Sequence, residues 1–100
     1  MEENYNGWEN RETWAVKLHW DNNSRDQEYF SGLASEFKKS DKSVHEFSEE
    51  LFNIAEEIFD SVIMQAQGTR EAKLFVADVG SLWRVNWREI AQAYYDEVDE

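Results

Sequence analysis

The stretch SVHEFSEELFNIAEEIFDSVIMQAQG, residues 43–68, decides the fold class of this chain. Apolar side chains recur in it every three or four residues, which is the spacing of one face of a helix. The stripe consists of Val44, Phe47, Leu51, Ile54, Ala55, Ile58, Val62 and Ala66, widened by Phe52, Phe59 and Ile63. Ser43 and Glu46 form a capping-box pattern at its start, and Gly68 is a typical stop. We therefore predict a long amphipathic helix that packs centrally between others.

Two further helices are predicted before this segment. Asn10 is a suitable N-cap for a helix over 11–21. The alternating apolar residues of 14–20 would also suit a half-buried strand, so both structures stay open for this segment. Residues 21–24 have turn chemistry, and Ser24 with Gln27 forms a second capping-box pattern, which predicts a helix over 25–38.

Two more helices are predicted after it. Thr69 can cap a fourth helix that includes the apolar run 74–79, and Gly80 followed by Ser81 interrupts or ends it. Asn86 and Glu89 repeat the capping pattern ahead of a terminal helix over 87–98. The expected fold is thus an all-α single domain of about five helices over residues 1–100, with an irregular lead-in at 1–9.

Composition limits the class of protein. Aromatic residues make up 15% of the chain, which is enough apolar material for a core despite the high polarity. Cys is absent, so disulfides and thiolate metal sites are excluded. The N-terminus lacks the basic and apolar regions of a signal peptide, and no apolar run is long enough to span a membrane. We expect a cytoplasmic protein.

Charge is the most informative bulk property. Asp and Glu number 22 against 10 Lys and Arg, which gives a formal net charge of −12. Such a field repels nucleic acids and anionic membranes and attracts basic protein surfaces. Direct binding to DNA or RNA is therefore not expected, although a high negative charge can also serve solubility alone.

The sequence lacks the residue patterns of a catalytic or metal site. His19 and His45 do not have metal-ligand spacing to each other or to a pair of carboxylates. The run 21–26 superficially resembles a calcium loop, but Asp26 replaces the required Gly and Ser35 replaces the required Glu. We expect no enzymatic activity, no cofactor and no bound metal.

The polar face of the long helix carries the strongest functional signal. Six carboxylates fall within an arc of about 120° when residues are placed at 100° per step. They are Glu46, Glu49, Glu50, Glu56, Glu57 and Asp60. Neither Lys nor Arg shares this face, although an ordinary surface helix usually offsets such acids with Lys. The row is either a partner-binding surface or a solvated face that happens to be acidic.

The spacing of these charges favours a partner that normally handles nucleic acid. Residues 46–60 span about 21 Å, so the six carboxylates give one charge per ~3.5–4 Å. One strand of duplex DNA carries one charge per ~3.4 Å. A second acidic group at 96, 97, 99 and 100 could extend the row. This pattern predicts an acidic inhibitor that occupies a basic, phosphate-binding surface on another protein.

The aromatic residues support a competing hypothesis. Trp14, Trp20, Trp83 and Trp87 occupy helix-compatible positions and are expected mainly in the core. Trp8, in the lead-in, is the best candidate for an exposed anchor, although the sequence favours the core for this residue too. Tyr95 is another candidate anchor. An interaction or regulatory adaptor with such an apolar or mixed interface is the alternative function. The basic group Lys38, Lys39 and Lys42 is interpreted as loop decoration.

Two segments resemble a family of short phage and mobile-element proteins without an assigned function. The first is Asn10-Arg11-Glu12-Thr13-Trp14 followed by Trp20-Asp21-Asn22, and the second is Asn86-Trp87-Arg88-Glu89-Ile90-Ala91. The resemblance covers about a quarter of the chain and implies no functional residues. By analogy, it implies a counter-defence role, such as inhibition of a restriction or CRISPR nuclease.

Overall fold

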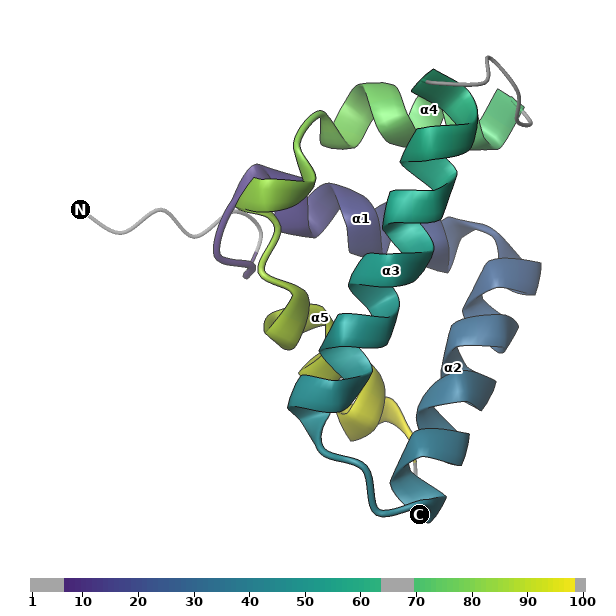
Figure 1. Cartoon of the computed structure of the whole chain (residues 1–100), viewed down its shortest axis with the longest axis vertical. Coiled ribbons are helices and arrows are strands. Elements are labelled where there is room, and N and C mark those ends of the chain that lie inside the picture. Colours follow the sequence, from purple (N-terminus) through teal and green to yellow (C-terminus); the bar gives the residue numbers. More distant parts are fainter. Residues whose placement is uncertain (1–6, 64–69, 99–100) are drawn as a thin grey trace.

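The computed structural model describes residues 7–63 and 70–98, and within them the chain is all-helical (Figure 1). Five α-helices and one short 3-10 helix follow one another without a β-strand in these described ranges. The elements are α1 (Arg11–Asn22), α2 (Ser24–Lys39), α3 (Val44–Ile63), α4 (Arg70–Val79), η1 (Leu82–Arg84) and α5 (Trp87–Glu97). The predicted all-α fold is confirmed, and residues 11–21 belong to a helix rather than a strand.

Side-chain caps fix where most of these helices begin. Asn10 accepts a hydrogen bond from the backbone N–H of Thr13 at 2.9 Å, and Asn86 accepts one from Glu89 at 3.1 Å, as predicted. The second helix departs from the prediction, because Asn23 and not Ser24 is its N-cap. An Asn side chain reaches the N–H groups two and three residues ahead, which leaves Ser24 inside the first turn. The predicted stop at Gly68 and cap at Thr69 lie outside the described residues.

The helices enclose one aromatic core. Trp20 of α1 stacks on Phe30 of α2 with ring centroids 4.0 Å apart and on Phe75 of α4 at 5.7 Å. Phe30 stacks in turn on Tyr94 of α5 at 5.8 Å. Since these rings come from four helices, the aromatic side chains stabilise the tertiary fold as a connected cluster.

The long helix α3 bridges two parts of the molecule (Figure 1). Near its start, Phe47 is fully buried and stacks on Tyr95 of α5 at 5.3 Å. Near its end, Phe59 meets Phe75 of α4 edge to face at 5.9 Å. The apolar stripe therefore covers α5 and α4 in succession, and the opposite side of the helix faces outward.

Lys38 has a structural role that its position in a basic cluster does not indicate. Its ammonium donates to the carbonyl oxygens of Tyr95 and Val98 at 2.9 and 3.2 Å. These carbonyls lie at the C-terminal end of α5, where the helix dipole favours a positive charge. The interpretation of Lys38 as loop decoration was wrong, because it ties the end of α2 to the end of α5.

Candidate functional site

The six predicted carboxylates lie on the outward side of α3. Glu50 is half-buried and the other five residues are exposed, as is Asn53 in the middle of the row. They share this side because the opposite side is occupied by buried residues, among them Phe47, Leu51 and Ala55. The fold thus presents the acidic row to solvent along most of the length of α3.

Glu46 also has a local structural role. Its carboxylate accepts a hydrogen bond from the backbone N–H of Ser43 at 2.8 Å, and the Ser43 hydroxyl accepts one from the N–H of Glu46 at 3.1 Å. This is the predicted capping box. The hydrogen bond from the Ser43 backbone, aided by the nearby charge of Lys42, holds the pKa of Glu46 below its usual value. Glu46 is therefore ionised and fixed in position at the start of the row.

Most of the other carboxylates are not neutralised by the protein itself. Glu49 lies 3.1 Å from the His45 imidazole, and both side chains are well exposed, so a protonated His45 offsets that charge only partly. Glu50, Glu56 and Glu57 have no ion-pair or hydrogen-bond partner within residues 7–63 and 70–98. The row therefore keeps a dense negative charge facing water.

The proposed extension of the row into the C-terminal acids is weak. The Glu97 carboxylate accepts a hydrogen bond from the ammonium of Lys17 at 3.0 Å, and Asp96 accepts one from Gln92 at 2.9 Å. Residues 99 and 100 lie outside the described part of the chain. Glu97 therefore serves the fold, and the candidate surface is confined to α3.

Exposure of the aromatic residues differs from the sequence-based expectation. Trp83 is 84% exposed, although it was expected in the core. It lies in η1, which follows Gly80, and the positive φ of 79° at Gly80 redirects the chain after α4. The helical spacing that suggested burial does not continue through this turn. Trp83 is therefore an exposed tryptophan that helical spacing did not predict.

The two aromatic anchors that the sequence suggested are engaged in the fold. Trp8 is half-buried against the core, and the Lys17 ammonium lies 6.0 Å from its ring. Tyr95 is only 8% exposed, and its hydroxyl donates to the carbonyl of Lys42 at 2.9 Å. Neither side chain is available as an exposed anchor. The anchor hypothesis was therefore wrong for Tyr95, and Trp8 packs against the core as the sequence favoured.

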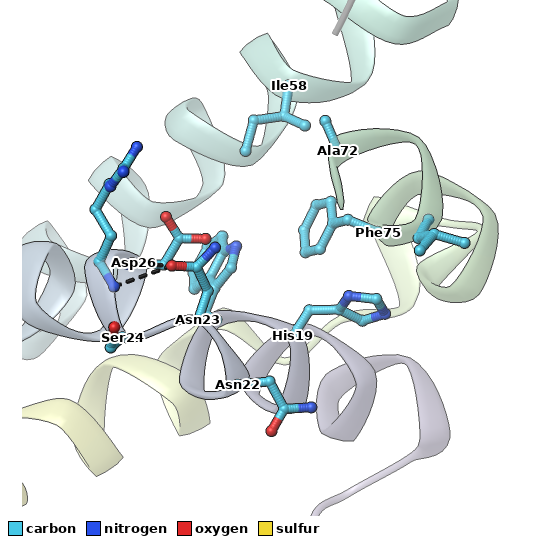
Figure 2. A pocket seen from close by; sticks show the side chains of 11 residues that line it. His19, Asn22, Asn23, Ser24, Asp26, Ile58, Ala72 and Phe75 are labelled. Carbon is cyan, nitrogen blue, oxygen red and sulfur yellow. Dashed lines mark hydrogen bonds between the residues drawn. The ribbon is translucent and has the colours of Figure 1, made fainter. Parts of the chain in front are cut away.

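A half-open pocket of about 770 Å³ lies where the end of α1 meets the start of α2 (Figure 2). Asn23 and Asp26 line one side, and His19 and Phe75 line the other, below Ile58. Asn23 accepts hydrogen bonds from the N–H groups of Arg25 and Asp26 at 2.9 and 3.3 Å, so these amides at the start of α2 are not free for an anion. The pocket therefore offers a weaker candidate site than α3.

His19, another polar residue at this pocket, also holds the fold together. The His19 imidazole lies 2.8 Å from the Asp78 carboxylate and meets Phe75 edge to face, which fastens α4 to α1. In the ranges that the structure describes, no group of three or more His, Cys, Asp or Glu residues has the arrangement of a metal site.

Comparison with known proteins identifies the family of this chain. Residues 1–100 match the model of a family described as "Family of unknown function (DUF7249)". The chain belongs to this family. Membership in DUF7249 covers the whole chain, including the acidic helix, and assigns no activity to it. No curated protein and no solved structure matches the chain. None of the described helices combines the length and the apolar character needed to cross a membrane.

Proposed function

We propose that this protein is an acidic inhibitor that binds a nucleic-acid-handling protein through the outward face of α3. The supporting observation is the row Glu46, Glu49, Glu50, Glu56, Glu57 and Asp60, which faces solvent on a rigid helix. The backbone of a helix is already ordered, so binding through a helix costs less backbone conformational entropy than binding through a loop. The row would occupy Arg and Lys side chains that otherwise hold phosphates.

Charge density supports phosphate mimicry. The row spans about 21 Å at 1.5 Å per residue, which gives one carboxylate per ~3.5–4 Å. This approximates the ~3.4 Å spacing of charges along one DNA strand. The net charge of −12 adds a long-range attraction toward basic surfaces and disfavours direct binding to nucleic acid.

The finer proposal concerns the biological role. The Asn10–Trp14 and Asn86–Ala91 segments resemble short phage and mobile-element proteins, and such elements must evade host nucleases. The partner we propose is accordingly a restriction or CRISPR effector in a host cell, with this protein acting in counter-defence. This step rests on analogy, whereas the acidic surface rests on the geometry of α3.

The test compares two variants that remove equal charge. The first replaces Glu49, Glu50, Glu56 and Glu57 with Gln, and leaves Glu46 in place because it caps α3. The matched control changes four exposed acids elsewhere, with Glu28→Gln, Glu36→Gln, Asp41→Asn and Asp96→Asn. Each immobilised protein is exposed to nuclease-treated lysate, and bound proteins are eluted first with duplex DNA and then with a salt gradient.

Phosphate mimicry predicts a DNA-binding protein that duplex DNA displaces and that elutes steeply between about 0.1 and 0.5 M salt. The α3 variant should lose this protein while the control variant keeps it. If the two variants retain equal amounts of this DNA-binding protein, the proposal is contradicted. Any loss of binding would then follow the net charge that was removed and not the α3 face.

A second candidate function is favoured by Trp83. An indole that is 84% exposed is typical of a residue that anchors a protein interface. A helical interaction or regulatory adaptor with a mostly apolar interface would bind its partner with weak salt dependence, since buried apolar area would hold the complex. Survival of the complex at high salt would favour this alternative.

A further inference from the structure

Trp83 is the most exposed large hydrophobic side chain in the described part of the chain. The others in this class are Leu18, Tyr29, Ile63 and Leu74, which are 38–61% exposed. Single exposed aliphatic residues are common on protein surfaces and need no explanation. A tryptophan exposed to this degree is different, because the indole is the side chain most enriched among the residues that dominate binding energy at interfaces.

The backbone on both sides of Trp83 is held in place. The Leu82 carbonyl accepts hydrogen bonds from the indole N–H of Trp87 at 3.2 Å and from the N–H of Val85 at 3.3 Å. The Arg84 carbonyl accepts one from the Asn10 side chain at 2.7 Å. The exposed indole therefore projects from a short segment fixed to α5 and to the start of α1, so little backbone order remains to be gained on binding.

The indole lies beside the acidic row. Its ring centroid is 5.7 Å from that of Phe52 on α3, and Phe52 contacts Trp87 edge to face at 5.9 Å. Glu49 precedes Phe52 by three residues and Glu56 follows it by four, so both share its side of the helix and lie about 10 Å apart along the axis. Two exposed carboxylates thus lie on the side of α3 that carries Phe52, the ring that Trp83 contacts.

Arg84 does not cancel this charge. Its guanidinium Nε lies 3.2 Å from the Glu12 carboxylate, on the side of η1 that faces α1. The surroundings of Trp83 on α3 are therefore net negative. A second copy of the chain would bring two such acidic surfaces together, which electrostatic repulsion disfavours. Charge complementarity selects a cationic occupant instead.

We propose that Trp83, Glu49 and Glu56 form one mixed docking surface for a protein whose cationic surface contains an apolar recess. The indole enters the recess, and the two carboxylates pair with Arg or Lys side chains at its rim. The recess supplies affinity through apolar burial, and the ion pairs supply orientation and fast association. This inference rests on the proposed function and specifies the partner further, since phosphate mimicry alone gives Trp83 no role.

Two synthetic peptides of equal charge can test this surface. Each contains eight arginines, with two serines at the centre of one peptide and two leucines at the centre of the other. Binding of both labelled peptides to the full chain is measured by fluorescence anisotropy at five salt concentrations. Apolar burial on Trp83 should make the leucine peptide bind roughly 5-fold tighter than the serine peptide, with the same salt slope.

Variants separate the two parts of the proposal. Trp83→Ser should reduce the leucine-to-serine affinity ratio to about one and leave the salt slope unchanged. Leu74→Ser, which removes another exposed apolar side chain, should keep the wild-type ratio. The double variant Glu49→Gln with Glu56→Gln should lower the salt slope for both peptides and keep the ratio above one. Circular dichroism of each variant checks that the helices remain folded.

The two failures are distinguishable. A wild-type ratio of one, or a ratio that Trp83→Ser does not change, overturns the docking role of Trp83 and leaves the acidic-face function standing. An unchanged salt slope in the Gln variant contradicts the acidic-face function instead. Absence of binding by both peptides overturns both. NMR gives an independent readout. The indole N–H resonance of Trp83 is identified by its absence from the spectrum of Trp83→Phe, and the leucine peptide should shift this resonance in the wild-type chain.

Discussion

The ammonium of Lys17 lies 3.0 Å from the carboxylate of Glu97, although 80 residues separate them in the chain. The Lys17 side chain is only 6% exposed and also pairs with Asp21 at 2.7 Å. Its ammonium lies 4.5 Å from the centre of the Tyr94 ring, which adds a cation–π contact. A buried, multiply paired cation thus joins α1 to the end of α5.

Replacing Lys17 with Met should destabilise the fold, because it leaves Asp21 without its cation. We expect a loss of about 2 kcal/mol in the free energy of unfolding, which is less than the ~3–5 kcal/mol for a fully buried broken pair because both carboxylates keep some contact with water. Urea unfolding followed by circular dichroism measures this loss. Lys73→Met on the exposed side of α4 is the matched control and should change stability little.

The capping box of α3 should be visible in the acid stability of the protein. A carboxyl whose pKa is lowered by folding stabilises the folded state when the pH is above 4.5, the usual pKa of this group. This contribution is lost as the pH falls through the pKa of the folded state. Glu46→Gln keeps a hydrogen-bond acceptor but not the charge. The difference in Tm between wild type and Glu46→Gln should therefore shrink on acidification below pH 4.5.

Glu57→Gln is the control for this experiment, because Glu57 lies on the same helix without a capping contact in the described residues. A wild-type advantage over Glu46→Gln that stays constant between pH 7 and 3 would show that the charge of Glu46 contributes nothing to the cap.

Tyr94 should control stability at high pH. Burial, together with the nearby charges of Asp21 and Glu97, raises the pKa of its phenol above the usual value of 10.0. A group whose pKa is raised by folding holds its proton more tightly in the folded state, so stability falls as pH rises above 10.0. Tyr94→Phe should weaken this decline, as measured by urea unfolding between pH 8 and 11.

At neutral pH the same substitution should change stability by no more than about 1 kcal/mol. The Tyr94 hydroxyl is buried and makes no hydrogen bond of ordinary geometry within the described residues, so its removal leaves no donor that depended on it. Tyr29→Phe at a 53% exposed position is the control. Parallel alkaline declines in wild type and Tyr94→Phe would refute the role of Tyr94.

Two tryptophans should differ sharply in their effect on stability. Trp20 is 3% exposed and stacks on Phe30 and Phe75, so Trp20→Ala should cost about 3–5 kcal/mol. Trp83 is 84% exposed and contacts the ring of Phe52, so Trp83→Ser should change stability by about 0.5 kcal/mol or less. A large loss of stability in Trp83→Ser would mean that the indole serves the fold rather than a partner.

The helices could be predicted from the sequence because their signals are local. The apolar spacing of 43–63 and the caps at Asn10, Ser43 and Asn86 depend on residues within one or two turns of each other. The same locality explains why the acidic row could be placed on one face of α3. Its exposure follows from the apolar stripe opposite.

The remaining features depend on contacts distant in sequence. Nothing near Lys17 in the sequence indicates that Glu97 will join Asp21 in pairing with it inside the fold. The exposure of Trp83 follows from the turn at Gly80, which breaks the helical spacing used to infer burial. Tyr95 became buried because α5 packs against both α2 and α3. Exposure of individual aromatic residues is therefore a tertiary property that periodicity does not determine.

The position of α5 among α1, α2 and α3 also constrains when the chain can fold during its synthesis on the ribosome. Ile90, Ala91 and Tyr94 are fully buried, so a nascent chain that ends before them lacks the centre of its core. The first three helices must therefore wait, with their apolar faces unpaired, until α5 has been made. Folding of the domain therefore follows the synthesis of α5, and the time for which chaperones and proteases can reach its apolar faces depends on when α5 leaves the ribosome.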